Sequence, residues 1–231
     1  MKLSNSRRPR KGRERHKHLT YFKLEKALPD PGCPICNLVQ ASIKTFFEAF
    51  LYEKVNDVGL RTRFNADAGI CNRHAYQLLG CHDGLAIAVM YRPLLELAVD
   101  AVGRGADAPG NRGACFICDT EREAEERYLS ALAEFLDDRE LEGSFVSSSG
   151  LCLPHYELVR RRAPEMPTWF VELHAAKYER LLEGVKRYLD AANWSLGEKR
   201  PKLTPEEERV WTEVIALYSG YEGMPPRPKN G

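Results

Sequence analysis

The sequence has no apolar run of the ~18 to 20 residues that a membrane-spanning helix needs, and its first residues lack the apolar core of a secretory signal. We therefore expect a cytoplasmic protein with no membrane partner. No stretch alternates apolar and polar residues as a β-strand does, so the expected fold class is all-α. A Gly-rich phosphate loop, a nucleophile elbow and an H-E-x-x-H motif are also missing. No motif therefore points to an enzyme.

Net charge is nearly absent too, because 34 basic residues face 33 acidic ones, for +1 over 231 residues. The balance is uneven: residues 1–18 carry eight Lys or Arg and one acid, Glu14 (8 − 1 = +7), so the remainder sums to −6. Such a segment buries too little apolar surface to offset the entropy of ordering. We expect residues 1–19 to form a disordered basic arm. Residues 1–18 could bind nucleic acid or a ribonucleoprotein, and a merely solvated tail is the alternative.

Cysteine is present in quantity, and six of the seven cysteines belong to a pattern that occurs twice. A C-x2-C pair is followed by a C-x2-H pair after 34 residues (71 − 36 − 1) in the first copy and 33 (152 − 118 − 1) in the second. In a reducing compartment, paired cysteines bind metal more often than they form disulfides. The first copy consists of Cys33, Cys36, Cys71 and His74, and the second of Cys115, Cys118, Cys152 and His155.

Three thiolates and one imidazole fit a tetrahedral soft-metal site, so the sequence predicts two Zn²⁺ ions, one for each copy of the pattern. Four protein ligands leave no position for water or substrate, which is typical of structural zinc. Iron–sulfur clusters are the main alternative cofactors, because three cysteines and one histidine can also hold a cluster. A redox pair, a coincidental motif and disulfides are further alternatives.

The duplication extends beyond the ligands. Aligning the two copies places the motif Ala88, Tyr91, Leu94, Leu95 on Ala175, Tyr178, Leu181, Leu182. A tandem repeat explains these matches. We expect a first helical metal-binding repeat over residues 20–103, a linker over 104–113, a second repeat over 114–196, and a C-terminal helix with a disordered tail over 197–231.

Apolar periodicity places the helices. It predicts one over Leu38–Lys54, leading away from the first C-x2-C pair, and others over Leu85–Val102 and Thr168–Ala192. Residues Asn56–Ala68 are then expected to bring the chain back, partly as a helix, so that each repeat closes its own metal site. Thr204, followed by Pro and two acids, predicts the start of the last helix.

Other candidate residues carry weaker signals. Cys81 and His82 have no counterpart in the second repeat, and neighbouring side chains on a helix diverge, so a half-buried free thiol is favoured over a catalytic pair. His174 falls on the core side of its helix and is expected to be a packed residue. The acidic run Glu121–Glu126 is expected to be a solvated helix face rather than a carboxylate dyad.

Several segments together resemble an uncharacterised prokaryotic protein family, a domain of unknown function with duplicated C-x2-C and C-x2-H pairs. The likeness covers roughly Tyr21 to Gly220, and it implies the two metal sites without implying an activity. The basic arm and Cys81-His82 depart from it. The segments that carry it are Phe22-x-Leu24-x-x-Ala27-Leu28, Gly32-Cys33-Pro34-Ile35-Cys36, Leu51-Tyr52-Glu53-x-Val55-Asn56-Asp57, Gly69-Ile70-Cys71-Asn72-Arg73-His74 and Gly84-Leu85-Ala86-Ile87.

The sequence therefore supports three functional hypotheses. The first is a non-enzymatic, zinc-stabilised helical binding or adaptor protein, with nucleic acid or a ribonucleoprotein at its basic arm and a protein partner on its helical body. The second is a redox protein that uses iron–sulfur clusters or zinc-held thiol switches. The third, an enzyme that uses Cys81 or a pocket between the repeats, has no motif in its favour.

Overall fold

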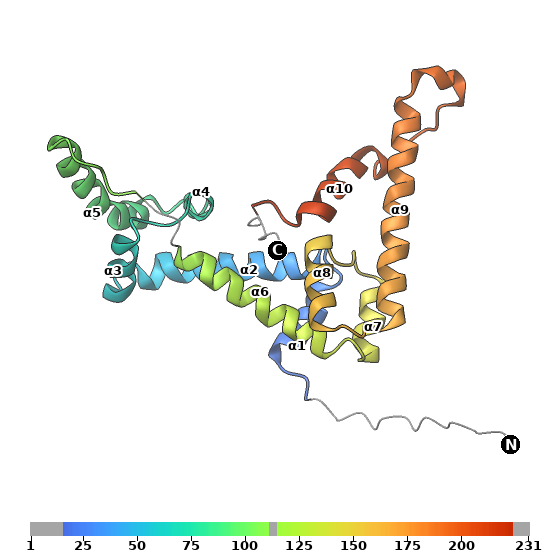
Figure 1. Cartoon of the computed structure of the whole chain (residues 1–231), viewed down its shortest axis with the longest axis horizontal. Coiled ribbons are helices and arrows are strands. Elements are labelled where there is room, and N and C mark those ends of the chain that lie inside the picture. The colour runs from blue at the N-terminus through green and yellow to red at the C-terminus, as the bar shows by residue number, and fades with distance from the viewer. Residues whose placement is uncertain (1–15, 111–114, 224–231) are drawn as a thin grey trace.

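The computed structural model describes residues 16–110 and 115–223 (Figure 1). Within these ranges the chain forms helices and no strands, so the prediction of an all-α fold is confirmed. Short helical turns occupy Trp194–Lys199 and Glu207–Arg209, and α2 continues as a π-helical turn over Phe50–Lys54. The α-helices are α1 (Leu19–Ala27), α2 (Pro34–Ala49), α3 (Val58–Ala66), α4 (Asn72–Leu79), α5 (Gly84–Gly103), α6 (Phe116–Glu134), α7 (Arg139–Val146), α8 (Leu153–Arg162), α9 (Thr168–Ala192) and α10 (Val210–Ser219).

Helices α2 and α6 lie side by side at the centre and run in opposite directions (Figure 1). Residues from the first half of α2, such as Leu38, share a buried cluster with Leu132 near the end of α6. Phe47, near the end of α2, shares a second cluster with Phe116 at the start of α6. The beginning of each central helix therefore meets the end of the other.

Two hydrophobic cores flank this central pair, and residues from both halves of the chain contribute to each of them. The first core joins α1 and the start of α2 to α6, α7, α8 and α9. The second joins the end of α2, α3, α4 and α5 to the start of α6. Because the cores are shared, the two halves of the chain, which the sequence predicts to be two repeats, are interleaved rather than stacked as separate units.

Helix α1 shows the interleaving clearly, because its buried Tyr21 contacts the second repeat. The Tyr21 ring lies 4.9 Å from that of Phe135, and its hydroxyl donates to Asp138 at 2.9 Å. Asp138 caps α7, accepting the backbone N–H of Leu141 at 3.0 Å. Lys17, part of the predicted basic arm, donates to the Tyr21 hydroxyl at 2.9 Å and pairs with Asp138. Residues 1–15 of that arm lie outside the described residues.

The segment that was expected to bring the chain back after α2 does not do so. Part of this segment is helical, as predicted: α3 begins after Asp57, whose side chain accepts the N–H of Leu60 at 2.7 Å. However, α3 has nine residues and α2 sixteen, which correspond to ~13 Å and ~24 Å at 1.5 Å per residue. Cys71 therefore remains near the far end of α2, beside the start of α6.

Helices α5 and α9 project away from the central pair (Figure 1). The bounds of α9 match the sequence prediction, and α10 packs on it, with buried Val210 against Gly184. Thr204 and Glu207 exchange reciprocal hydrogen bonds of 2.9 and 3.2 Å, which form the predicted cap. The first turn after this cap is 3-10 helical, so α10 itself begins at Val210.

None of the helices that the structure describes is both long enough and apolar enough to cross a bilayer.

Candidate metal centres

The structure gathers all eight predicted metal ligands into two groups, and each group could hold one metal ion. Within each group the donor atoms all lie within 4.8 Å of one another. We call the groups site A and site B. Site A consists of Cys33, Cys36, Cys152 and His155, and site B of Cys71, His74, Cys115 and Cys118.

This pairing corrects the expectation that each repeat closes its own site. Each site takes its C-x2-C pair from one half of the chain and its C-x2-H pair from the other half. The cause is the antiparallel packing of α2 and α6. Since α3 stays at the far end of α2, the pair Cys71 and His74 lies beside the start of α6 and not beside Cys33.

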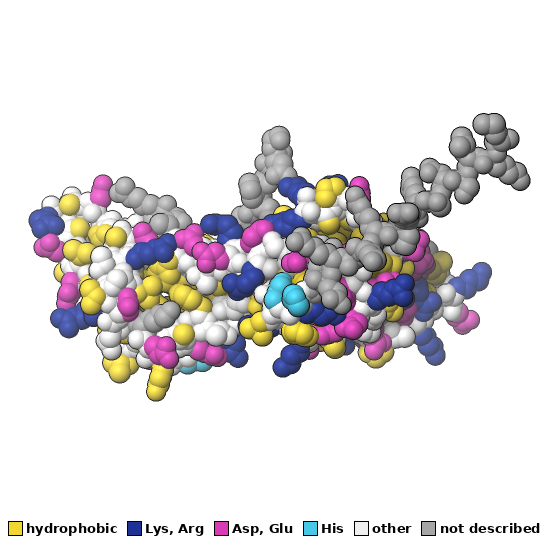
Figure 2. Space-filling model, turned by 90° about the horizontal axis from the view of Figure 1, so that it is seen from below, with side chains coloured by type: hydrophobic (Ala, Val, Ile, Leu, Met, Phe, Trp, Pro, Cys, Tyr) yellow, Lys and Arg dark blue, Asp and Glu magenta, His cyan; other side chains and the backbone are white. Residues whose placement is uncertain are grey.

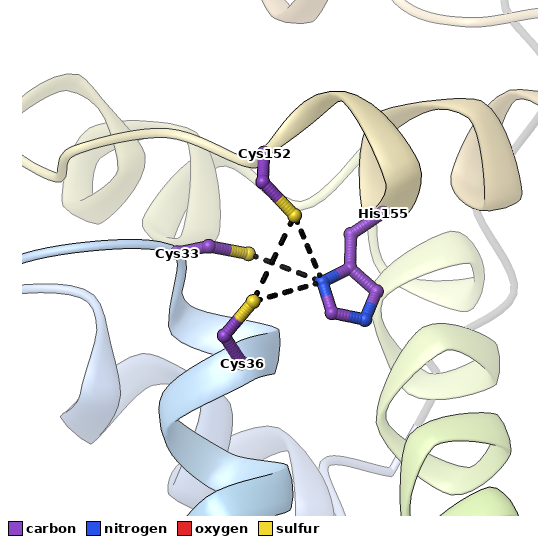
Figure 3. Close-up of side chains that lie close together, drawn as sticks. All are labelled: Cys33, Cys36, Cys152 and His155. Carbon is purple, nitrogen blue, oxygen red and sulfur yellow. Dashed lines mark hydrogen bonds between the residues drawn. The ribbon is translucent and has the colours of Figure 1, made fainter. Parts of the chain in front are cut away.

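In site A, three sulfurs surround one imidazole nitrogen (Figure 3). His155 Nδ1 lies 3.4 Å from Cys33 Sγ, 3.3 Å from Cys36 Sγ and 3.2 Å from Cys152 Sγ. Cys36 Sγ and Cys152 Sγ are 3.7 Å apart. His155 is fully buried, and Cys36 and Cys152 are each only 4% exposed.

Site B repeats this geometry. His74 Nδ1 lies 3.3 Å from Cys71 Sγ and 3.4 Å from the sulfurs of both Cys115 and Cys118. Cys71 Sγ and Cys118 Sγ are 3.7 Å apart. A tetrahedral Zn²⁺ with bonds of ~2.3 Å to sulfur and ~2.0 Å to nitrogen would set sulfurs ~3.8 Å apart and sulfur ~3.5 Å from nitrogen. Both groups therefore have the size of a single-ion site.

Helix N-termini surround both sites. The residues Cys33, Cys71, Cys115 and Cys152 are the N-caps of α2, α4, α6 and α8. The second ligand of each pair lies in the first turn of the same helix, so α2 begins at the motif and not at Leu38 as predicted. Three thiolates around a divalent ion give a formal charge of −1, which the positive ends of two helix dipoles per site stabilise.

Without a metal, one thiol of each group, Cys33 in site A and Cys115 in site B, has a lowered pKa. Burial opposes ionisation of Cys33, but contacts with Cys152, Cys36 and His155 outweigh it and hold the Cys33 pKa well below its usual value. Burial likewise opposes ionisation of Cys115, yet hydrogen bonding with His74 lowers its pKa to about 6. Metal binding requires deprotonated thiols, so the metal affinity of both sites should fall as pH falls.

The imidazole of site A has a carboxylate behind it. His155 Nε2 lies 2.9 Å from Glu125 Oε1, and this bond fixes the tautomer in which Nδ1 faces the thiols. Burial opposes protonation of His155, but Cys152, Cys33 and Glu125 together hold its pKa well above the usual value. Glu125 comes from the middle of α6, and its contact contradicts the expectation that Glu121–Glu126 is only a solvated face.

Glu121, one turn before Glu125 on α6, lies next to the His74 ring of site B and is only 5% exposed. Both of its carboxylate oxygens accept from the guanidinium of Arg73, one of them at 2.7 Å, and it also accepts from the Tyr221 hydroxyl. Arg73 Nη2 lies 3.9 Å from Cys118 Sγ as well. The Glu121 carboxylate is thus close to the His74 ring, with Oε2 3.8 Å from Nε2, but it does not bond to it.

Helix α9 positions the turn that precedes Cys152. His174, buried as predicted and outside both groups, accepts the Leu151 N–H at 3.0 Å on Nε2. Its Nδ1 donates to the Phe170 carbonyl at 2.7 Å, and Tyr178 donates to the Leu151 carbonyl at 3.0 Å. Gly150 has a φ of +78°, and a Cβ there would come within 3.0 Å of the Lys177 side chain.

Sequence reasoning identified the ligands but missed these supporting residues. One usable signal was present: Cys118, Glu121 and Glu125 follow an i, i+3, i+7 spacing, which places them on one face of a helix that begins at a ligand. The roles of His174 and Tyr178 had no comparable signal, because they depend on how α9 docks against a distant turn.

Cys81 and His82 belong to neither site. They follow the end of α4 at Leu79 rather than lying on a helix, and Cys81 is exposed rather than half-buried as expected. Desolvation raises the pKa of the Cys81 thiol, which does not favour a nucleophile. Cys81 lines a cavity of about 970 Å³ between α2 and α4, together with Lys44, Phe47, Arg73, Gln77 and Tyr221.

Comparison with known proteins gives one similar protein of undetermined role. No family model matches the chain. No solved structure matches it either. The chain is 25% identical over 196 residues to an uncharacterised 23.9 kDa protein from the xynA 3′ region of Caldicellulosiruptor sp. (strain Rt8B.4), an alignment that covers 81% of this chain and 95% of that protein. The chain is therefore a distant homologue of an uncharacterised bacterial protein.

Proposed function

We propose that this chain is a non-enzymatic, zinc-stabilised helical binding or adaptor protein in which two Zn²⁺ ions hold the interleaved repeats together. The observation that carries the proposal is the closure of both sites. Each offers four soft donors from the protein itself within 4.8 Å, which fills a tetrahedral ion and leaves no position for water or substrate. A metal held in this way stabilises the fold and leaves function to the protein surface.

The spacing of the donors favours a single ion over a cluster. An iron–sulfur cluster distributes its protein ligands over several iron atoms, so the ligands lie farther apart than those of one ion. Here all four donors of each group lie within 4.8 Å of one another, which places them around one ion. Among single ions, three thiolates and one imidazole favour Zn²⁺.

Membership of the family of uncharacterised proteins with duplicated C-x2-C and C-x2-H pairs is part of the proposal. The distant homology over 81% of the chain supports it, as does the gathering of both motif pairs into sites A and B.

Two surfaces support a binding role. The first is the basic segment of residues 1–15, which holds seven Lys or Arg and one acid. Figure 2 shows that on the face it presents, basic and acidic side chains of the body are interspersed, so a nucleic acid partner would depend on the basic segment. The second consists of exposed apolar side chains at two separate places on the body, Leu95, Val99 and Val102 on α5 and Trp211 on α10, either of which a protein partner could cover.

Metal analysis of protein purified without oxygen or chelators tests the central part of the proposal. We expect a colourless protein with two zinc ions per chain, which unfolds when both are removed. A brown preparation with iron and inorganic sulfide would establish the redox alternative instead. Retention of helicity and melting temperature after complete metal removal would refute the structural role.

Salt-dependent binding tests the nucleic acid part. Each phosphate contact contributes about −0.9 to the slope of log K against log salt on duplex DNA. Deletion of residues 1–15 should reduce both the affinity for DNA and the salt slope. Deletion of residues 224–231, in which Arg227 and Lys229 are the only charged residues, should change both quantities little. Equal slopes for the full chain and the 1–15 deletion would remove nucleic acid as a partner of this segment.

A further inference from the structure

The two sites differ in the hydrogen bonding of the histidine Nε2 atom, the ring nitrogen that points away from the thiols. In site A, His155 Nε2 bonds to Glu125 at 2.9 Å. In site B, His74 Nε2 is buried and has no hydrogen-bond partner, although Glu121 Oε2 lies 3.8 Å away. Both carboxylates belong to α6 and are one helical turn apart, so the same helix supports one imidazole and leaves the other unsupported.

Glu121 is held away from His74 by other partners. Arg73, one residue before His74, donates to both of its oxygens, and the hydroxyl of Tyr221 donates to Oε1. Tyr221 follows α10 directly, and the segment that it begins lies against α4: a Cβ at Gly223 would come within 3.3 Å of Arg73 Cδ. The segment after α10 therefore contributes to the surroundings of site B.

We propose that site B is the exchangeable metal site of the pair, and that Arg73 and Tyr221 together lower its affinity by keeping Glu121 from His74. The inference rests on the proposed zinc-binding function and assigns a different role to each of the two sites. Site A holds its ion as a permanent part of the fold. Site B releases and takes up its ion, and the hydrogen bonds from Arg73 and Tyr221 to Glu121 set how readily it does so.

The physical basis is the support that a carboxylate gives to a metal-bound imidazole. The bond to Nε2 orients the ring and raises the basicity of the nitrogen that binds the metal, and its loss typically costs 10- to 100-fold in metal affinity. His74 lacks this bond, so site B should be weaker than site A by about that factor. Arg73 Nη2 also approaches Cys118, but 3.9 Å is the outer limit for an N–H···S contact and compensates little.

Access from solvent also favours site B as the site that exchanges its metal ion. The cavity of about 970 Å³ is lined by Arg73, Glu121 and Tyr221, so it opens onto the network behind His74. A chelator or metal-accepting partner that enters the cavity meets the residues that control site B. Cys71 and Cys118 are also only partly buried, whereas in site A only Cys33 is.

Stepwise chelation of the zinc-loaded full chain, followed by N-ethylmaleimide and peptide mapping, tests the inference. The first zinc equivalent to leave should expose Cys71, Cys115 and Cys118, at a chelator strength about 10- to 100-fold below that needed for the second. Cys81 should react throughout and serves as an internal standard. Earlier labelling of Cys33, Cys36 and Cys152, or simultaneous labelling of both groups, would overturn the inference.

A double-mutant cycle tests the role of Tyr221. Tyr221→Phe removes one of the three hydrogen bonds that hold Glu121 and leaves the two from Arg73, so it should strengthen site B, by less than ~10-fold. The gain should vanish in Tyr221→Phe combined with Glu121→Gln, and Tyr218→Phe on exposed α10 should show none. Loss of affinity in Tyr221→Phe would refute the role assigned to Tyr221. A chain that takes up no zinc would instead refute the proposed function itself.

Discussion

The contact between His155 and Glu125 gives the sharpest quantitative prediction about site A. Glu125→Gln keeps the shape of the side chain and one acceptor oxygen but removes its charge. The bond to His155 Nε2, 2.9 Å in the structure, then changes from a charge-assisted hydrogen bond to a neutral one. Zinc affinity at site A should fall while site B, which does not use Glu125, keeps its own.

The magnitude follows from the two kinds of bond. A hydrogen bond to a charged group contributes ~1.5 to 3 kcal/mol and a neutral one ~0.5 to 1.5 kcal/mol. A difference of ~1.4 kcal/mol is tenfold in affinity, which is the lower end of the 10- to 100-fold range for partners of metal-bound histidines. We therefore expect ~10-fold weaker binding in Glu125→Gln and, because no acceptor remains, a loss approaching 100-fold in Glu125→Ala.

Competition with a chromophoric zinc chelator measures both sites in one titration. Glu126→Gln is the matched control, because Glu126 is the next residue of α6 but is exposed and pairs with Arg162. Loss of the Glu126–Arg162 ion pair should cost at most ~1 kcal/mol of stability and leave zinc affinity unchanged. Equal zinc affinity in Glu125→Gln and wild type would show that Glu125 does not support the metal, and an equal loss in Glu126→Gln would show a general charge effect.

Three further predictions concern the fold around the sites. A protease site inserted in residues 104–110 should give two fragments that stay associated until zinc is chelated, since both sites join the repeats; separation with zinc still bound would contradict this. His174 has a pKa of about 4 because burial disfavours its charged form, so its contribution of ~3 kcal/mol is complete above pH ~6.5 and lost as pH falls to about 4. Denaturant unfolding should show the difference between wild type and His174→Phe shrinking over that range, and a constant difference would refute the assignment. Gly150→Ala should cost ~1 to 3 kcal/mol, measured in the same way, because its φ is +78° and a Cβ would crowd Lys177; unchanged stability would exclude strain at that turn.

Much of the fold was accessible from local sequence patterns. The amphipathic periodicity of residues 168–192 predicts α9 with its observed bounds, because one apolar stripe packs against the core while the rest meets solvent. The ligands were equally accessible, since C-x2-C and C-x2-H spacings place two donors in one helical turn. These features depend on residues close together in the chain.

Local sequence patterns could not predict which C-x2-C pair shares a site with which C-x2-H pair. Either pairing unites one C-x2-C with one C-x2-H and satisfies the same metal chemistry, so ligand spacing cannot choose between them. The choice follows from the antiparallel contact of α2 with α6 and from the short α3, both properties of tertiary packing. For the same reason the sequence predicts Glu125 to be solvated, because its contact with His155 depends on the packing of α8 against α6.

The crossed pairing is the central claim, and the zinc content of two double variants tests it most directly. Cys33→Ser with Cys152→Ser removes two ligands of site A alone, so this variant should keep one zinc ion per chain at site B. Cys33→Ser with Cys71→Ser removes a ligand from each site and should lose both ions. One ion retained by the second variant and none by the first would show instead that each repeat closes its own site.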